Sequence, residues 1–249
     1  MSDHLIEARD LRVSYGGRVV AEVPRLDVGA GECVAIVGES GSGKSTTLLS
    51  LLGLTQNAEI SGQVRVCGVD VLTASPRALR ELRGARAALV MQSPHAALSP
   101  ATRLGVLMRR ALKLHGVRDV DRTMARAMEE VLLDRELLRR YPHEVSGGQA
   151  QRFAIALAIA LGAEVILADE PTSALDVTVQ AEVVGVLRRL RAERDLALLL
   201  VSHDLALVST IADRVLVMKD GAVVESGPAA TVLAEPSHPY TRELLEALP

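Results

Sequence analysis

The sequence predicts an α/β fold built around a buried parallel sheet. Four runs, at residues 33–37, 87–91, 165–170 and 196–201, have the length and apolar character of strands that are covered on both faces. Segments with helical spacing of apolar residues lie between these runs, and glycine or polar residues end each of them. Ligands of open α/β sheets bind outside the carboxyl ends of the strands. We therefore expect the functional site at these strand ends.

The composition indicates a compact globular protein without a nucleic-acid surface. The chain has 249 residues, of which 49% are hydrophobic, enough to fill a sizeable core. The formal net charge of −3 gives no basic footprint, and Trp is absent while Phe153 is the one phenylalanine, so stacking platforms for bases are scarce. Cys33 and Cys67 supply neither a disulfide framework nor a metal cluster, which favours a reducing cytoplasm. We predict no nucleic-acid partner.

Neither a secretion signal nor a membrane-spanning helix is predicted. Residues 1–10 are polar and lack an apolar central region. The most apolar segment, 153–168, is interrupted by Glu164 and falls short of the roughly 18 uncharged residues that a spanning helix needs. Any membrane role is therefore expected to come through a partner.

The strongest motif follows the first buried strand and precedes a helix. It fits G-x-x-x-x-G-K-[ST] and consists of Gly38, Glu39, Ser40, Gly41, Ser42, Gly43, Lys44 and Ser45. Small residues let backbone N–H groups surround a phosphate, and the following helix adds the positive end of its dipole. Lys44 is expected to reach the β- and γ-phosphates, and Ser45 to offer its hydroxyl to Mg²⁺. The alternative is a turn without a ligand, but the lysine, the hydroxyl, the strand and the helix all favour the phosphate loop.

Antiparallel strands are predicted on both sides of this loop. Residues 5–37 alternate apolar and polar positions around glycine turns, residues 60–72 are typical of a short hairpin, and residues 76–84 are typical of a helix. Tyr15 ends the first strand. It is either an aromatic that stacks on adenine or a half-buried strand residue, and its position alone does not decide between them.

A helical insertion is predicted in the middle of the chain. The strand 87–91 ends at Gln92, and the prolines within 93–100 are expected to exclude strand and helix alike, which leaves a loop. Apolar residues then recur at helical spacing over 102–140, with a break at 116–121.

A second glycine-containing loop stands before an apolar helix at 152–161. Its residues are Ser146, Gly147, Gly148 and Gln149. Ser146 suits the N-cap position, and the two glycine amides beside it would face an anion at the helix N-terminus. A loop that serves only to cap the helix is the alternative.

Ionisable side chains follow two further buried strands. Asp169 and Glu170 end the run 165–170; in P-loop enzymes the first such acid holds the Mg²⁺ shell, and an adjacent carboxylate can take a proton from the attacking water. Solvated acids at the start of a loop are the alternative. His203 follows the strand 196–201. A lone histidine is usually structural, but its place beside the other strand ends favours a ligand contact.

The remaining segments complete the predicted core. A helix is expected from 177 to about 194. Its inward residues are predicted to be Val177, Val184, Leu187 and Leu190. Residues 215–218 and 222–225 flank an Asp-Gly turn and predict a hairpin, and the tail from Ser237 onward is predicted as a loop and a short amphipathic helix.

These motifs, in this order, resemble the nucleotide-binding subunit of ABC transporters along the whole chain. Residues 38–45 look like Walker A, Gln92 like the Q-loop glutamine and residues 146–149 like the signature loop. Residues 165–170 look like Walker B, residues 173–176 like the D-loop and His203 like the H-loop histidine. Tyr15 matches the A-loop aromatic that stacks on adenine. The resemblance implies an ABC-type P-loop NTPase with a RecA-like core, an antiparallel β-subdomain and an inserted α-helical subdomain. The implied segments are 1–92, 93–161 and 162–249.

The resemblance also implies the ligands and the residues that hold them. ATP and Mg²⁺ are the implied cofactors. The residues that contact the nucleotide would be Tyr15, residues 38–45, Thr46, Ser146, Gly147, Gly148 and Gln149. The residues that contact the metal would be Ser45, Gln92 and Asp169. The catalytic residues would be Lys44, Gln92, Glu170 and His203.

A narrower resemblance concerns the solute. Residues 92–100 and 238–245 are similar to the importer branch for dipeptides, oligopeptides and nickel. Two departures weaken this second match: Gln149-Ala150 stands where that branch often has methionine after the two glycines, and the longer cysteine-bearing extension of some relatives is absent.

The partners implied are those of a transporter. Two such subunits, as a homo- or heterodimer, would pair head to tail with each ATP between Walker A of one and the signature loop of the other. Two integral membrane permease subunits and, indirectly, an extracytoplasmic solute-binding protein would complete the transporter. This chain would lie on the cytoplasmic face of the cell membrane as a peripheral subunit. The competing class is a soluble ABC ATPase of a non-transport complex, such as the carbon–phosphorus lyase system. A single cassette and a non-basic surface weigh against DNA-repair and ribosome-associated types.

Overall fold

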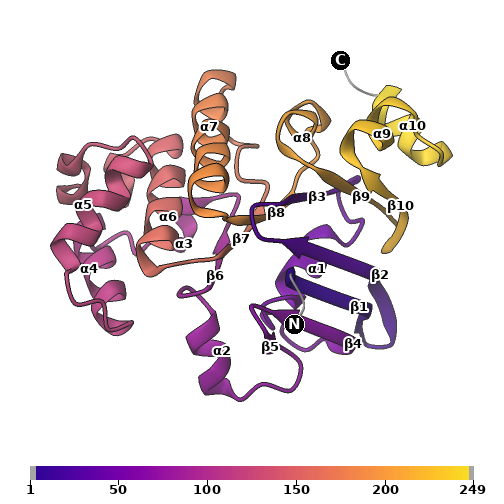
Figure 1. The fold of residues 1–249 in the computed structure, drawn as a ribbon, viewed down its shortest axis with the longest axis horizontal. Helices are drawn as coiled ribbons and strands as arrows, with labels where there is room; N and C mark the ends of the chain where they lie inside the picture. The colour runs from indigo at the N-terminus through magenta and orange to yellow at the C-terminus, as the bar shows by residue number, and fades with distance from the viewer. Residues whose placement is uncertain (1–3, 247–249) are drawn as a thin grey trace.

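One mixed sheet of ten strands runs through residues 4–246, the part of the chain that the computed structural model describes (Figure 1). The ends of the predicted segments 1–92 and 162–249, namely residues 1–3 and 247–249, lie outside the described residues. The strands are β1 (His4–Tyr15), β2 (Arg18–Gly29), β3 (Cys33–Val37), β4 (Glu59–Val66), β5 (Val69–Asp70), β6 (Ala87–Val90), β7 (Val165–Asp169), β8 (Ala197–Val201), β9 (Arg214–Lys219) and β10 (Ala222–Pro228). Their order across the sheet is β5-β4-β1-β2-β10-β9-β3-β8-β7-β6.

Helices flank this sheet on both faces. They are α1 (Lys44–Ser50), α2 (Pro76–Leu82), α3 (Pro94–Ala97), α4 (Leu104–Leu114), α5 (Val120–Glu130), the 3-10 turns η1 (Arg135–Arg139) and η2 (Pro142–Glu144), α6 (Gly147–Leu161), α7 (Val177–Arg194), α8 (Leu205–Ile211), α9 (Ala229–Ala234) and α10 (Pro239–Glu246). Figure 1 shows α3 to α6 gathered at one end of the molecule, α7 and α8 over one face of the central strands and α1 on the other. Within residues 4–246, no helix is both long and apolar enough to cross a bilayer.

The centre of the sheet is parallel and its other end is antiparallel. Strand β3 pairs in parallel with β8 and β9, and the parallel pairing continues from β8 to β7 and from β7 to β6. Strands β1, β2, β4 and β5 pair antiparallel. All residues of β3 and β8 are buried, as their apolar runs predict. The predicted α/β fold is confirmed, and the carboxyl ends of β3, β6, β7 and β8 meet at one edge.

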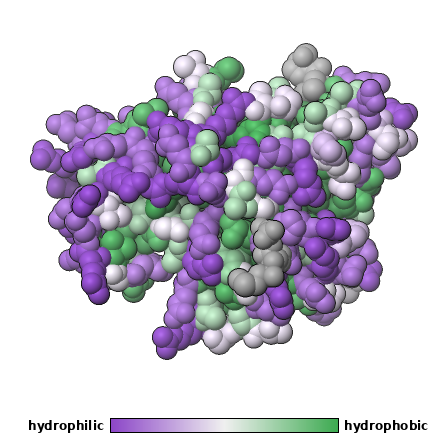
Figure 2. Space-filling view, in the orientation of Figure 1, coloured by the Kyte–Doolittle hydropathy of each residue, from purple (hydrophilic) through white to green (hydrophobic). Residues whose placement is uncertain are grey.

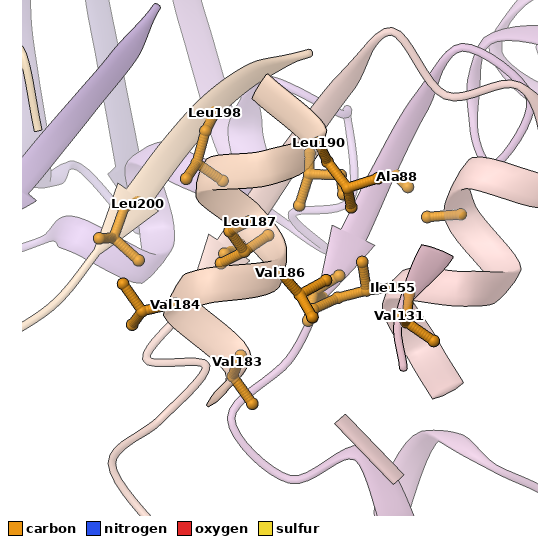
Figure 3. Close-up of a cluster of buried hydrophobic side chains, with 14 of the residues drawn as sticks. Ala88, Val131, Ile155, Val183, Val184, Val186, Leu187, Leu190, Leu198 and Leu200 are labelled. Atoms are coloured by element: carbon orange, nitrogen blue, oxygen red, sulfur yellow. The ribbon is translucent and has the colours of Figure 1, made fainter. Parts of the chain in front are cut away.

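Helix α7 joins the sheet to the helical end of the molecule. Val184 and Leu187 lie towards Leu198 and Leu200 of β8, while Val186 lies beside Ile155 of α6 (Figure 3). The prediction for the first residue of this helix is wrong, since Val177 is 83% exposed. Val177 directly follows the N-cap, and the first buried residue of α7 is Val183.

Further elements differ from the predictions. Residues 93–100 contain a helix, α3, because Pro94 stands at its start, where a missing N–H costs nothing. Helix α6 begins at Gly147, before the predicted start at 152, because its capping box is at Ser146. The sequence does not predict α8 or α9, whereas the predicted tail helix is confirmed as α10. The face seen in Figure 2 is mostly hydrophilic, with hydrophobic residues exposed in small separate areas.

Candidate functional site

A polar hollow of about 340 Å³ lies where the carboxyl ends of three parallel strands meet. It is lined by Ser40, Gly41, Gly43, Lys44, Ser45, Thr46, Gln92, Asp169 and Glu170. These residues follow β3, β6 and β7. The three strands are far apart in the chain, but β6 and β7 are neighbours in the sheet and only β8 separates β7 from β3. The structure therefore brings together half of the residues that the sequence singled out.

The loop between β3 and α1 has a shape that requires glycine at two positions. Gly38 has φ 148° and Gly43 has φ 97°, both in the region that side chains disfavour. A Cβ atom at Gly38 would overlap the carbonyl oxygen of Met218, and one at Gly43 would overlap that of Val20. Gly43 is also the N-cap of α1, so the next amides of the helix have no intrahelical partner. The loop is thus an anion cradle held from two sides by other strands.

Lys44 lies in this cradle with its ammonium group already directed at the loop. Its side chain is buried, and Nζ donates hydrogen bonds to the carbonyl oxygens of Gly38 (2.8 Å) and Glu39 (2.6 Å). Burial lowers the pKa of Lys44, and the nearby carboxylates of Glu170 and Asp169 oppose that shift. A compact cation at this position suits terminal phosphates.

Ser45 and Asp169 form a pair of oxygen ligands at the floor of the hollow. Ser45 Oγ donates to Asp169 Oδ1 over 3.0 Å. Burial raises the pKa of Asp169, with the neighbouring charge of Glu170 adding to the rise, while the bond from Ser45 and the charge of Lys44 lower it. A half-buried carboxylate whose charge is incompletely compensated, next to a hydroxyl, fits a hard cation such as Mg²⁺.

Glu170 and His203 meet from the ends of neighbouring strands β7 and β8. His203 Nδ1 and Glu170 Oε1 are 3.0 Å apart. Glu170 has φ 47°, a left-handed conformation that is uncommon outside glycine, and its N–H donates to the carbonyl oxygen of Val201 (2.9 Å). This unusual backbone turns the carboxylate towards the hollow and the histidine.

Gln92 is linked to the same group of side chains. Its Nε2 donates to Ser173 Oγ (3.0 Å), and Ser173 Oγ donates in turn to the carbonyl oxygen of Glu170 (3.2 Å). The residue after β6 is therefore connected through Ser173 to the residue after β7. This connection was not expected from the sequence, where Ser173 was assigned to a loop without a contact of its own.

The loop 146–149 lies elsewhere. None of its residues is among those that line the hollow in the described part of the chain. The predicted N-cap is confirmed: Ser146 Oγ accepts from the N–H of Gln149 (3.2 Å), and Gln149 Oε1 accepts from the N–H of Ser146 (3.0 Å), which is a capping box. Ser146 is exposed at the start of α6.

Tyr15 lies at the end of the β1–β2 hairpin, next to the glycine loop rather than in the hollow. It pairs with Arg18 across the hairpin and is 38% exposed. Val20 of the same hairpin is the residue whose carbonyl oxygen stands against Gly43. An exposed ring close to the loop keeps the stacking role open as a prediction.

One contact of the loop could not be found by sequence reasoning. The N–H of Glu39 donates to Oη of Tyr240 in α10, over 3.0 Å. The tail around Tyr240 stands out in the sequence, but no local pattern connects it with a loop 201 residues earlier.

Comparison with known proteins gives these residues a context. A family model described as ABC transporter matches residues 22–173. A protein of Brucella abortus (strain 2308), named provisionally as a peptide import ATP-binding protein, is 44% identical over 98% of this chain and 77% of its own length. The dipeptide transport ATP-binding protein of Haemophilus influenzae is 40% identical over 98% of this chain and 78% of its own length. A dimeric ATP-binding cassette in a post-hydrolysis state bound to ADP and Pi has a TM-score of 0.77 and 25% identity, covering 90% of this chain and 98% of that one.

Proposed function

The chain belongs to the ABC transporter family, and from this premise we propose that it is the ATP-hydrolysing subunit of a peptide importer. The ATPase activity and its coupling to transport follow from the family. The choice of peptides is supported by relatives that match nearly the whole chain, one of them the dipeptide transport ATP-binding protein. The observation that carries the mechanism is the hollow in which Lys44, Ser45, Asp169 and Glu170 converge.

In this proposal the glycine loop binds the phosphates of ATP. Backbone amides of the loop 38–45, apart from that of Glu39, and the first amides of α1, including that of Thr46, surround the phosphate oxygens, and Lys44 contacts the β- and γ-phosphates. Ser45 and Asp169, with the amide oxygen of Gln92, would hold Mg²⁺. The metal would supply positive charge that neutralises the phosphates. Tyr15 stacks on the adenine from the end of the β1–β2 hairpin.

Glu170 and His203 then act on the attacking water. The carboxylate of Glu170 accepts its proton, and His203, 3.0 Å from that carboxylate, holds the γ-phosphate and the water in line. The strained backbone at Glu170 is supported by its bond to Val201 of β8, so the acid and the histidine are fixed relative to each other. Gln92 and Ser173 tie the same residue to β6.

The signature loop is proposed to act on the ATP of a second subunit. Ser146 is exposed at the start of α6, and no residue of this loop lines the hollow of its own chain, among the residues described. A head-to-tail pair would place Ser146 and Gly147 of one subunit over the phosphates held by the other. ATP would then favour the closed pair, and hydrolysis would remove the contact that keeps it closed.

The remaining partners would be two membrane permease subunits at the cytoplasmic face of the membrane, supplied in turn by an extracytoplasmic solute-binding protein. Affinity purification of the chain from its native membranes tests this directly. Two co-purifying integral membrane subunits, and dipeptide-stimulated uptake after reconstitution into vesicles, are the expected results. Nickel uptake is measured in the same vesicles as the competing solute. Recovery with soluble enzymes of phosphonate cleavage instead of membrane subunits would overturn the importer assignment and leave the ATPase assignment in place.

A further inference from the structure

The tail helix α10 contacts the phosphate-binding loop through one hydroxyl group. We propose that Tyr240 is a positioning residue for ATP binding, which fixes the peptide unit between Gly38 and Glu39 and thereby the entrance of the loop. The proposal rests on ATP binding at the glycine loop, as argued under the proposed function. It assigns a role to the tail, which that function does not use.

The peptide unit between Gly38 and Glu39 is held at both of its polar ends. Its carbonyl oxygen, on Gly38, accepts from Lys44 Nζ over 2.8 Å. Its N–H, on Glu39, donates to Tyr240 Oη over 3.0 Å. Because a peptide unit is planar and rigid, two bonds at opposite ends restrict rotation of the whole unit. The hydrogen bond to Tyr240 also directs the N–H of Glu39 towards α10, so this N–H is not one of the groups that bind the phosphate.

Tyr240 is held firmly enough to serve as this support. Its side chain is 2% exposed, and the ammonium group of Lys219 lies 4.4 Å from the centre of its ring. Lys219 follows Met218, whose carbonyl oxygen stands directly against Gly38. The end of β9 therefore contacts both the ring of Tyr240 and the peptide that its hydroxyl holds. Burial raises the pKa of Tyr240, so the hydroxyl stays neutral at physiological pH.

The start of α10 is in turn fixed to strand β10. The carboxylate of Glu225 accepts from the N–H of Ser237 (2.8 Å), from Ser237 Oγ (2.7 Å) and from the N–H of His238 (3.1 Å). The N–H of Tyr240 donates to Nδ1 of His238 over 3.2 Å. A continuous set of hydrogen bonds thus leads from the sheet, through the tail, to the phosphate loop.

This arrangement matters most when Lys44 binds phosphate. The ammonium group that holds the carbonyl of Gly38 is the one that ATP would recruit. The bond from Glu39 to Tyr240 would then be the support that keeps the peptide in its orientation. Losing that bond should weaken the binding of any ligand that uses the loop, because the loop must be ordered again on binding.

The test is Tyr240→Phe, which removes the hydroxyl and keeps the buried ring. Titration calorimetry on the full chain measures the affinity for Mg-ATP and, separately, for magnesium tripolyphosphate. Both affinities are expected to fall by the same factor, about twofold to tenfold, the range for one hydrogen bond. In the assembled pair, KM for ATP is expected to rise by that factor while kcat stays the same. Glu225→Gln, which acts at the other end of the tail, should change KM in the same direction and by less.

Tyr141→Phe is the matched control, because it removes a tyrosine hydroxyl from the N-cap of η2, a residue that does not line the hollow. It is expected to bind both ligands as the wild type does. Wild-type affinity in Tyr240→Phe, or a fall in kcat and melting temperature with KM unchanged, would overturn the proposal. If the wild-type chain itself failed to bind Mg-ATP, the proposed function would fail before this inference is reached.

Discussion

The glycine-containing loops 38–45 and 146–149 both precede a helix, but different contacts hold them. In the loop 38–45, Gly38 and Gly43 have positive φ and stand against backbone carbonyls of two other strands. In the loop 146–149, Gly147 and Gly148 are absent from the positive-φ residues of the described chain and stand against side chains of Leu175 and Val179. The first loop needs glycine for its backbone shape, whereas the second needs it for a close approach.

The same contrast holds for the polar groups of the two loops. Lys44, Tyr240 and the end of β9 hold the first loop through contacts that join distant parts of the chain. The second loop is closed by its own capping box, between Ser146 and Gln149. A loop shaped by the whole fold can bind its ligand in a single subunit. An exposed, self-capped helix start is suited to meet a ligand that another subunit presents.

Removing the ammonium group from the first loop is expected to have the largest effect. Lys44→Ala should weaken Mg-ATP binding by about 100-fold or more, because a desolvated charge on the phosphates is lost. Titration calorimetry on the single subunit measures this. The matching change in the second loop, Ser146→Ala, should leave binding by the single subunit unaltered. Equal losses in the two variants would break the distinction between the loops.

The second-largest effect is expected from removing the charge of the catalytic carboxylate. Glu170→Gln keeps the side-chain shape, so Mg-ATP should still bind while turnover falls about 100-fold, the scale of a positioned acid–base group. A closed dimer should accumulate with ATP, because closure follows binding and only hydrolysis reverses it. Phosphate release and size-exclusion chromatography report the two results.

A carboxylate at the opposite end of the same strand provides the control for that variant. Glu164 precedes β7 and pairs with Arg86 at the surface (2.6 Å). Glu164→Gln should hydrolyse ATP at close to the wild-type rate. A Glu170→Gln protein that retained normal turnover would remove this residue from the mechanism; slow turnover without a dimer would instead favour a different ATPase subunit as the natural partner.

The next largest effect is expected from Tyr15→Ala. Stacking of a base on an aromatic ring contributes about 1–3 kcal/mol. The free energy of Mg-ATP binding should therefore become less favourable by that amount, while tripolyphosphate binding is unchanged. Tyr15→Phe keeps the ring and should bind as the wild type does. If Tyr15→Ala lowers the melting temperature but not the affinity, Tyr15 is a strand residue with no role towards the nucleotide.

A bulky residue in the second loop should affect hydrolysis without affecting binding. Gly147→Leu would press on Leu175, whose Cδ2 is 3.2 Å from the place of the new Cβ. We expect hydrolysis by the assembled pair to fall about tenfold through misplacement of the loop, and ATP binding by the single subunit to stay normal. Gly185→Leu is a suitable control, because nothing lies within 4 Å of a Cβ at that position of α7. A single subunit that hydrolyses ATP as fast as the pair would contradict the assigned role.

The difference between the loops also explains what the sequence could predict. Strands β3 and β8 and the loop 38–45 follow from local patterns: a continuous apolar run, then glycines, then a helix. The capping box at Ser146 is local too. By contrast, the bond from Glu39 to Tyr240 joins residues that no period or motif relates.

The errors of prediction have local causes of another kind. The helix α3 begins at Pro94, a residue that usually ends a helix but is accepted at its first position. Val177 fits the apolar period of α7, yet it precedes the part of that helix that the sheet covers. Periodicity identifies a helix face; it does not show how far along the helix the neighbouring strands extend.

The smallest effect is expected where the tail that supports the first loop is fixed to the sheet. Burial raises the pKa of Glu225, but hydrogen bonds from the side chain of Thr241 and from Ser237 and His238 outweigh it and lower this pKa from 4.5 to about 2. A lowered pKa means that the carboxylate stabilises the fold fully above about pH 4.5 and that this contribution is lost as the pH falls towards 2. Because Glu225 is partly exposed to solvent, we expect its carboxylate to contribute only about 1 kcal/mol to the free energy of unfolding.

Glu225→Gln should therefore lower the free energy of unfolding by about 1 kcal/mol at pH 7, and the difference from the wild type should shrink between pH 4.5 and 2. Urea unfolding at several pH values measures this, with Glu235→Gln in the same segment as an exposed control. The second loop has no such dependence on the tail, so Glu225→Gln should alter neither the capping box nor the contribution of Ser146 to hydrolysis. A constant difference across the whole pH range would show that the side chain acts through its shape rather than its charge, and that the tail is held by packing.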